Sequence, residues 1–236
     1  MMVKDKVAIV TGAARGIGAA AALALARDGY HIEASDIDGD GLARTQAAIV
    51  DAGGSVVTGL LDVRSSEAVA AYAAGVEGRH EGIDLLVSNA GFASIGYLED
   101  IDDAHWETVT DLNLTSHMRL ARAFVPRMKA RTSGRIICLG SIAGHTYGWA
   151  GRLAYASSKA GVTGLVRTLA MELGPHGITV NGVAPAGLHA AVEQVPLGRV
   201  GTNEDIGDFI AMLASDGARF MTGQMLSVDG GMSVSL

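Results

Sequence analysis

Tyr155 and Lys159 are the two residues of this chain whose types and spacing most directly suggest chemistry. Only Ala-Ser-Ser separates them, and a spacing of four places two side chains on the same face of a helix. A free tyrosine titrates near ~10, but a neighbouring positive charge favours the phenolate and lowers its pKa. The pair therefore suits proton transfer to or from an alcohol oxygen. The same spacing also fits an aromatic ring packed on a surface lysine stem, and the accompanying motifs favour the chemical interpretation.

A glycine-rich turn near the N-terminus predicts a dinucleotide site. Thr11–Gly18 follows an apolar run and opens an alanine-rich segment. In this strand–turn–helix context, backbone N–H groups and the helix dipole can bind a pyrophosphate, and the glycines let the backbone approach it. Three glycines among the 32 of the chain could instead serve tight packing alone. The residues of this turn that we assign to the cofactor are Gly12, Arg15, Gly16, Ile17 and Gly18.

A carboxylate at the end of the second apolar run bears on the choice of cofactor. Asp36 lies close to the offset of about twenty residues at which an acidic side chain can accept hydrogen bonds from the adenosine ribose. This favours NAD over NADP, because a 2′-phosphate would meet a like charge, although Arg15 could partly offset the repulsion. The alternative is a turn residue in Asp36–Gly39.

Short apolar runs alternate with longer alanine-rich amphipathic segments along the whole chain. This rhythm is typical of βαβ units around a parallel sheet buried on both faces. We expect strands at Lys6–Thr11, His31–Ser35, Val56–Leu61, Leu85–Ser88, Arg135–Leu139, Ile178–Val183 and Met225–Val228. We expect helices near Gly16–Arg27, Gly39–Asp51, Ser65–Arg79, Ala104–Ala130, Ala154–Leu173 and Asn203–Ala214. The sequence thus predicts one α/β domain over 1–236, a doubly wound Rossmann-type parallel sheet with helices on both faces.

Two local features of this pattern stand out. Thr202–Asp205 resembles a capping box that opens the last of the expected helices. His31 and Glu33 are unusual in a strand that ought to be apolar, and we expect them to be partly exposed toward one face.

The composition excludes several classes of function. The chain has 236 residues, 49% of them hydrophobic, and a formal net charge of −7, with a pI near 5.4. Nucleic acid and anionic membranes are poor partners for such a chain, so we expect a small-molecule substrate. Cys138 is the single cysteine, which predicts a buried thiol and a cytoplasmic location. The histidines lack metal-ligand spacing, and Met1–Val7 shows neither a secretory signal nor a membrane span.

With these residues assembled, the chain resembles the short-chain dehydrogenase/reductase family in its compact form. The resemblance extends from the first strand to Val228–Gly231, and the matching motifs are Thr11–Gly18, Asn89–Gly91, Asn113, Ser141, Tyr155 with Lys159, and Pro185. The resemblance implies a seven-stranded sheet and reversible hydride transfer between a nicotinamide and a secondary alcohol or ketone. It also implies a homo-oligomer, a tetramer in preference to a dimer, formed through the two long helices. Residues implied to line the cofactor are Asp62, Val63, Asn89, Ala90 and Gly91 on the adenosine side and Pro185 against the nicotinamide.

Four residues form the expected catalytic group. The alcohol proton must be removed for hydride to leave the carbinol carbon, and Tyr155 is assigned as the base, or as the acid in reduction. Ser141 can hydrogen-bond the same oxygen; otherwise it is a turn serine. Lys159 can lower the Tyr155 pKa and bind the nicotinamide ribose. Asn113 resembles the family asparagine that anchors a water on the proton path of the lysine. From the residues alone it would be a helix kink or a satisfied polar residue.

The chain departs from the family pattern at two places. Ser88 stands where the family usually has an asparagine before Asn89, which should change sheet hydrogen bonding more than chemistry. After Pro185 the family's nicotinamide-binding threonine and helical substrate lid are not evident. Either the lid near 186–195 is shortened, or a lid segment near Gly187–Leu188 is missing from this sequence. We favour the second, because lids belong to the least stable parts of a structure; an intact mass of 24.2 kDa would contradict it.

The substrate is less clearly indicated. Candidate pocket residues are Ser94, His145, Tyr147, Trp149 and Arg152. Tyr147 and Trp149 could equally be core or oligomer contacts, and Arg152 could bind an anionic group or be solvated. We favour a polyol, a sugar or a similar small secondary alcohol. The alternative is a 3-oxoacyl-(acyl-carrier-protein) reductase, which would normally require NADPH and a basic docking patch. An alternative of another class is a catalytically silent nucleotide-binding protein on the same fold.

Overall fold

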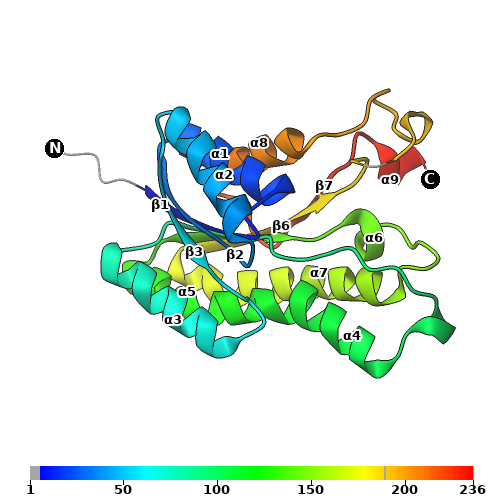
Figure 1. Ribbon diagram of the computed structural model, residues 1–236, viewed down its shortest axis with the longest axis horizontal. Helices are drawn as coiled ribbons and strands as arrows, with labels where there is room; N and C mark the ends of the chain where they lie inside the picture. Colours follow the sequence, from blue (N-terminus) through cyan, green and yellow to red (C-terminus); the bar gives the residue numbers. More distant parts are fainter. Residues whose placement is uncertain (1–5, 189, 236) are drawn as a thin grey trace.

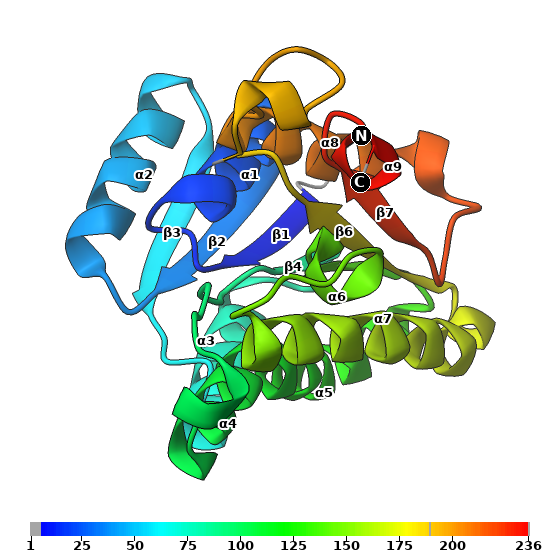
Figure 2. The ribbon, with the colours of Figure 1, turned by 90° about the vertical axis from the view of Figure 1, so that its right-hand side faces the viewer.

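The computed structural model describes residues 6–188 and 190–235. Within them, seven parallel strands form one sheet in the order β3-β2-β1-β4-β5-β6-β7, with helices on both faces (Figures 1 and 2). The strands are β1 (Lys6–Thr11), β2 (Tyr30–Asp36), β3 (Ser55–Leu60), β4 (Leu85–Ser88), β5 (Gly134–Leu139), β6 (Ile178–Pro185) and β7 (Met225–Val228). The strand order reverses between β1 and β4, where ligands of open α/β sheets bind. The predicted doubly wound fold is confirmed.

The helices divide into two layers, which Figure 2 shows above and below the sheet. One layer consists of α1 (Gly16–Arg27), α2 (Gly39–Asp51) and α8 (Asn203–Ala214), and the other of α3 (Ser66–Arg79), α4 (Asp103–Thr110), α5 (Ser116–Arg131) and α7 (Leu153–Leu173). Shorter elements are η1 (Leu98–Asp100), α6 (Ile142–His145), η3 (Gly174–His176), η4 (Val192–Gln194), η5 (Asp216–Ala218) and α9 (Met232–Ser235). Thr202 and Asp205 form the predicted capping box at the start of α8.

Two apolar cores, one on each face of the sheet, hold these layers together. The neighbouring β1 residues Ile9 and Val10 are both fully buried but belong to different cores, because successive side chains of a strand point to opposite faces. Val10 shares its core with Leu25 of α1, and Ile9 shares the other with Phe124 of α5. Each such side chain contributes about 1.5–3 kcal/mol by burial. The rigid sheet that results fixes the loops at its carboxyl edge.

The long helix predicted over Ala104–Ala130 is interrupted. Between α4 and α5 lies a π-helical segment, η2 (Asp111–Thr115), in which the Ser116 N–H reaches back to the Asp111 carbonyl oxygen. Asn113 sits in this segment with its side chain fully buried, donating to the Phe92 carbonyl oxygen at 2.9 Å and accepting from the Phe92 N–H at 3.0 Å. The widened turn therefore aims an amide at the loop after β4, and π-bulges of this kind are frequent at functional sites.

The expected exposure of Glu33 is wrong. Its side chain is fully buried in β2 and accepts two hydrogen bonds from Arg79, at 2.9 and 2.8 Å, and one from His80 Nε2 at 2.7 Å. Both partners lie at the end of α3, where Arg79 is the last helical residue and His80 follows it. A carboxylate is tolerated inside a protein when it is paired and hydrogen-bonded in this way, and neither partner is near Glu33 in sequence. His31 is partly buried beside it, with its ring 4.8 Å from that of His80.

Between the end of β6 and the start of α8, the described residues contain only the short turn η4 as regular structure. Residues 186–188 and 190–202 thus form no helical lid. In the described part of the chain, no helix combines the length and the apolar character needed to span a bilayer.

Candidate active site

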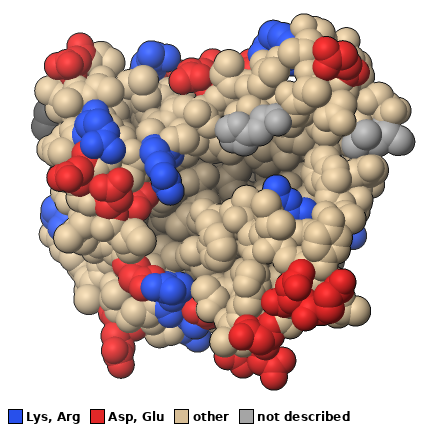
Figure 3. Space-filling model, turned by 45° about the vertical axis from the view of Figure 1, so that its right-hand side comes forward, with Lys and Arg blue, Asp and Glu red and all other residues tan. Residues whose placement is uncertain are grey.

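The predicted nucleotide residues surround a cavity of about 910 Å³ at the carboxyl edge of the sheet, which we call the nucleotide cleft. Figure 3 shows a hollow on this face of the molecule. The predicted residues that line it are Gly12, Arg15, Gly16, Ile17, Asp36, Asp62, Val63, Asn89, Ala90, Gly91, Tyr155, Lys159 and Pro185. Lining residues not singled out from the sequence include Arg64, Leu112 and Asn203. Asn203 opens α8, and nothing in its local sequence indicates that this helix reaches the cleft.

Gly18, which does not line the cleft, has a packing role. A Cβ at this position would collide with the Gly12 carbonyl oxygen and with the Asn89 side chain. Gly12 itself has a φ of +66°, which L side chains rarely adopt. These two glycines let α1 start close against β1, so that its first N–H groups face the cleft, as phosphate binding at a helix N-terminus requires.

Asn89 locks the glycine turn to the end of β4. Its side-chain amide donates to the carbonyl oxygens of Thr11, at 2.9 Å, and Gly12, at 3.1 Å, while its backbone N–H donates to Thr11 Oγ1 at 3.1 Å. The preceding Ser88 is buried, and its hydroxyl has no hydrogen-bond partner among the described residues. Asn89 thus braces the turn through its side chain and its backbone, and the Ala90 N–H adds a hydrogen bond to Thr11 Oγ1 at 3.2 Å.

Asp36 is held at the rim of the cleft by three backbone donors. Oδ2 accepts from Ala14 N–H at 3.1 Å, and Oδ1 accepts from the N–H groups of Ile37 and Asp38 at 2.7 and 3.1 Å. Further along the rim, hydrogen bonds from the Arg64 side chain hold the pKa of Asp62 below its ordinary value. The carboxylate of Asp36, which lines the cleft, has no such basic partner among the described residues and is held by backbone N–H groups.

Ser141, Tyr155 and Lys159 meet at the inner end of the cleft. Ser141 caps α6, and its hydroxyl oxygen accepts from Ala143 N–H at 3.1 Å, which leaves the hydroxyl hydrogen for another acceptor. Lys159 is 5% exposed, and burial lowers its pKa to about 8. Tyr155 lies one turn before it on α7 and is half-buried. The hydroxyl, phenol and ammonium predicted to act together are thus brought together by β5 and α7.

Asn113 joins this group through its position. A Cβ added to Gly91 would lie 2.7 Å from Asn113 Oδ1 and 3.6 Å from Lys159 Nζ, so these three residues are close neighbours. His117 of α5, which the sequence did not single out, is fully buried nearby. Burial and the charge of Lys159 lower its pKa to about 3. A histidine inside an amphipathic pattern carries no signal of this neighbourhood.

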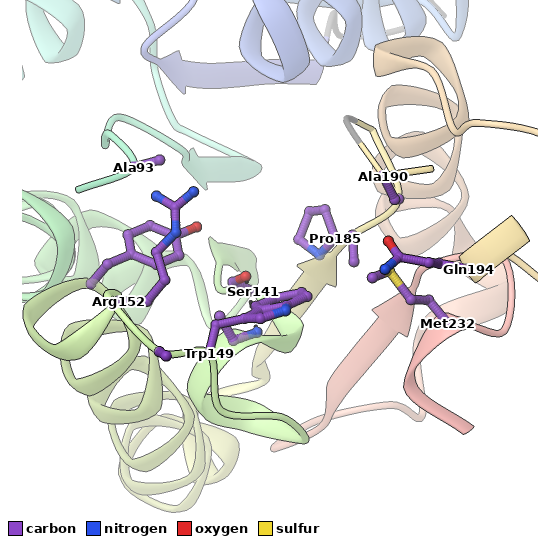
Figure 4. Close-up of a pocket in the computed structure, with 13 residues that line it drawn as sticks. Ala93, Ser141, Trp149, Arg152, Pro185, Ala190, Gln194 and Met232 are labelled. Atoms are coloured by element: carbon purple, nitrogen blue, oxygen red, sulfur yellow. Dashed lines mark hydrogen bonds between the residues drawn. The ribbon is translucent and has the colours of Figure 1, made fainter. Parts of the chain in front are cut away.

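A second cavity, of about 340 Å³, adjoins the nucleotide cleft; we call it the side pocket. Its lining residues are Ala93, Ser141, Ala143, Trp149, Ala150, Arg152, Tyr155, Pro185, Ala186, Gly187, Ala190, Gln194 and Met232. In Figure 4, Arg152 lies to the left of Ser141 and Trp149 just below it, whereas Gln194 and Met232 lie to the right of Pro185. Gln194 and Met232 come from η4 and α9, and their sequence gives no indication of this role.

The five candidate substrate residues separate in the structure. Trp149 and Arg152 line the side pocket, whereas Ser94, His145 and Tyr147 are not among its lining residues. Ser94 is buried and its hydroxyl lies 2.6 Å from His105 Nε2. Tyr147 packs edge-on against Trp149 with ring centroids 4.9 Å apart. Burial, more than the nearby Arg167, lowers the pKa of His145.

Comparisons with known proteins agree with this geometry. Residues 6–195 match the family model described as short chain dehydrogenase, and residues 185–233 match that described as enoyl-(acyl carrier protein) reductase. The chain is 42% identical to trans-4-hydroxycyclohexanecarboxylate dehydrogenase of Sinomonas cyclohexanicum, over 97% of this chain and 93% of that protein. It is 41% identical to the 3-oxoacyl-(acyl-carrier-protein) reductase FabG of Pseudomonas aeruginosa, over the whole of both chains.

Among solved structures, levodione reductase superposes with a TM-score of 0.94 at 27% identity, covering 99% of each chain. The named relatives are dehydrogenases and reductases that act on alcohol or keto groups, and the match to the dehydrogenase model covers most of this chain. The protein is therefore an oxidoreductase that belongs to the short-chain dehydrogenase/reductase family.

Proposed function

We propose that this protein transfers a hydride between NAD(H) and a small secondary alcohol or ketone, with Tyr155 moving the proton. The observation that carries the proposal is that Ser141 and Tyr155 line both the nucleotide cleft and the side pocket. A nicotinamide in the cleft and a substrate in the side pocket would meet at these two hydroxyls. A catalytic base must lie within hydrogen-bond reach of the proton that it removes.

The cleft residues fit a dinucleotide, because the glycine turn and the start of α1 line the cleft at Gly12, Gly16 and Ile17, and backbone N–H groups at a helix N-terminus can bind phosphate. A bound nicotinamide would supply the hydride acceptor or donor. In oxidation, Tyr155 takes the hydroxyl proton of the substrate, and Ser141 donates its own hydroxyl hydrogen to the same oxygen. Tyr155 accepts this proton in its deprotonated form, and the positive charge of Lys159 lies one turn further along α7.

Asp36 supports NAD as the preferred nucleotide. Three backbone N–H groups hold its carboxylate at the rim of the cleft, and carboxylate oxygens accept hydrogen bonds from ribose hydroxyls. The 2′-phosphate of NADP would bring a second negative charge to the same place. Arg15, exposed on the same rim, offers only a mobile counter-charge.

The side pocket supports a small substrate. Its lining is mostly apolar, with few hydrogen-bonding side chains, so among small secondary alcohols an apolar skeleton fits better than a polyol. The relative from Sinomonas cyclohexanicum acts, by its name, on a ring that bears a secondary hydroxyl group. That reaction has the chemistry proposed here.

An acyl-carrier-protein substrate is the second candidate, because of the similarity to FabG. The segment from η1 to α4 exposes four acidic residues, Glu99, Asp100, Asp102 and Asp103. Acidic side chains also gather below the hollow in Figure 3. An acidic carrier docking on this side would meet like charges, so we favour the free small molecule.

We also propose that the protein is a homo-oligomer, with a tetramer favoured. Helices α5 and α7 lie together on one face of the sheet (Figure 2) and expose Met118, Leu153 and Met171, the last of them 80% exposed. Exposed apolar groups on adjacent helices are suited to association with a second copy. Light scattering after size exclusion would distinguish a monomer from a dimer or tetramer.

The decisive experiment is an activity panel of small secondary alcohols, including polyols and sugars, assayed with NAD and NADP separately. We expect reduction of NAD with at least one class of alcohol and a much smaller rate with NADP. Absence of alcohol-dependent NADH formation across the panel, with NAD binding intact, would favour a catalytically silent nucleotide-binding protein instead.

A further inference from the structure

We propose that the substrate of the side pocket is a carboxylate-bearing alcohol or ketone with an apolar skeleton, and that Arg152 binds its carboxylate. This inference rests on the proposed function and adds the substrate class. Among the described residues that line the side pocket, Arg152 is the only charged one. It makes no ion pair with any described residue, although the chain carries a net charge of −7.

Arg152 carries a positive charge without an ion-pair partner among the described residues, which favours binding of an anionic ligand. The side chain is half-buried, and its guanidinium uses Nη1 to donate to the Ser94 carbonyl oxygen at 3.1 Å. A guanidinium has five N–H donors and matches a carboxylate in a bidentate arrangement. A partly desolvated cation without a counter-ion gains more from such a partner than one in water. The carboxylate of a substrate would supply the missing charge.

The guanidinium is held in place before any ligand arrives. Arg152 immediately precedes α7 and forms a β-bridge with Gly96, while the Gly96 N–H donates to the Gly151 carbonyl oxygen at 2.9 Å. The loop after β4 is thus fastened to the start of α7. In Figure 4 the Arg152 side chain extends toward Ala93, above Ser141 and on the side of the pocket opposite Gln194. Preorganised charges of this kind bind with less loss of entropy.

The rest of the pocket fits a hydrocarbon skeleton. Apart from Arg152, much of the wall of the side pocket is apolar, and it includes Ala143, Trp149, Pro185 and Met232. Tyr155 lies in the first turn of α7, three residues after Arg152, and both residues line the side pocket. One compact molecule can therefore contact the guanidinium and the phenol together.

The test compares matched acids and amides in the intact protein with NAD. The substrates are 3- and 4-hydroxycyclohexanecarboxylates and the corresponding carboxamides, which differ mainly in charge. We expect kcat/KM to be about 10- to 100-fold higher for the best acid than for its amide, as hydrogen bonds to charged groups allow. In Arg152→Gln this preference should disappear, because KM for the acid rises while kcat/KM for the amide changes little. In Arg152→Lys, part of the preference for the acid should return. Arg27→Gln, an exposed residue at the far end of α1, is the control.

A binding measurement separates this inference from the proposed function. Cyclohexanecarboxylate, which lacks the hydroxyl group, is titrated calorimetrically into the NAD complex of each variant. Tighter binding of this acid than of cyclohexanecarboxamide, abolished in Arg152→Gln, supports the inference even if no alcohol is oxidised. Equal turnover of acids and amides, or equal binding of the two probes to the wild-type protein, would overturn the inference. The proposed function would still stand as long as the protein oxidises an alcohol of either kind with NAD.

Discussion

Lys159 Nζ donates a hydrogen bond of 2.7 Å to the carbonyl oxygen of Leu139, the last residue of β5. The ammonium of α7 is thus anchored to the sheet rather than extended into solvent. An ammonium fixed in this way keeps one position in the cleft that it lines, whereas a mobile surface lysine would sample many positions.

The buried position of Lys159 should be visible in the pH dependence of stability. Burial lowers its pKa from 10.5 to about 8, so the folded protein releases this proton before the unfolded chain does. Below pH 8 both states are protonated, and the cost of burying the charge is fully present. Between about pH 8 and 10.5 the unfolded state binds more protons, and the free energy of unfolding should rise by about 3 kcal/mol.

Urea unfolding of the cofactor-free protein from pH 7.5 to 10.5 measures this effect, with Lys159→Met as the comparison. The difference in unfolding free energy between the two proteins should change across the window. Parallel pH profiles would show that Lys159 is not desolvated.

Replacing Tyr155 by phenylalanine should lower kcat by about 10²- to 10⁴-fold, because the proton acceptor is lost while the ring is kept. The dissociation constant for NAD, measured by fluorescence titration, should stay within a few-fold of wild type. Undiminished turnover in this variant would rule out the phenol as the proton-transferring group.

Asp36→Asn should shift the enzyme toward NADP, because the variant removes the like charge that meets the 2′-phosphate. The ratio of kcat/KM for NAD to that for NADP should fall by about tenfold or more. Asp40→Asn, at an exposed position one turn further along, removes the same charge outside the cleft and is the matched control. An equal change in both variants would mean that general electrostatics, not ribose binding, sets the preference.

Glu33→Gln should destabilise the fold by about 2 kcal/mol, because it weakens charged hydrogen bonds to Arg79 and His80 inside the protein. The loss of stability is limited because the side chain of Arg79 is 44% exposed, so water can solvate its charge when the ion pair is weakened. Glu67→Gln on the exposed face of α3 should change stability by less than about 0.5 kcal/mol. Chemical denaturation of both variants decides this, and equal effects would contradict the structural role of Glu33.

Gly18→Ala should weaken NAD binding and lower stability, since its Cβ would collide with the backbone of Gly12. Gly78→Ala in α3 is the control, because a Cβ there meets no atom within 4 Å. That substitution should stabilise the protein by about 0.5–1 kcal/mol. A Gly18→Ala protein with wild-type NAD affinity would show that the glycine turn does not need its close packing.

The sequence predicted the fold well where local patterns determine it. The limits of β1, β4 and β7 and of α1, α2 and α8 agree with the expected ranges, because apolar runs, turn glycines and helix caps are short-range signals. The helix was expected to run without a break over Ala104–Ala130, although a helix kink was one interpretation of Asn113; the π-helical turn there has no sequence motif of its own. The burial of Glu33 was missed because its partners come from α3, 46 and 47 residues away.

The candidate site divides in the same way. Residues that follow strands, such as Asp36 and Asn89, were predicted to lie at the carboxyl edge and line the cleft there. Gln194 and Met232 reach the side pocket only through the path of the chain after β6, which no local pattern encodes. Ser94 was placed in the correct loop, but its side chain turns to His105 instead of the pocket.

Met232 gives the C-terminal end of the chain an influence that its distance from Tyr155 in sequence would not suggest. Among the described residues, the last one that lines the nucleotide cleft is Asn203, whereas the side pocket is also lined by Met232. The Asp229 carboxylate holds this end through the N–H groups of Gly231 and Ser233, both at 2.9 Å. Proteolytic trimming or a fused tag at this end would therefore impair substrate binding before nucleotide binding. An enzyme altered in this way should still bind the nucleotide but turn over slowly.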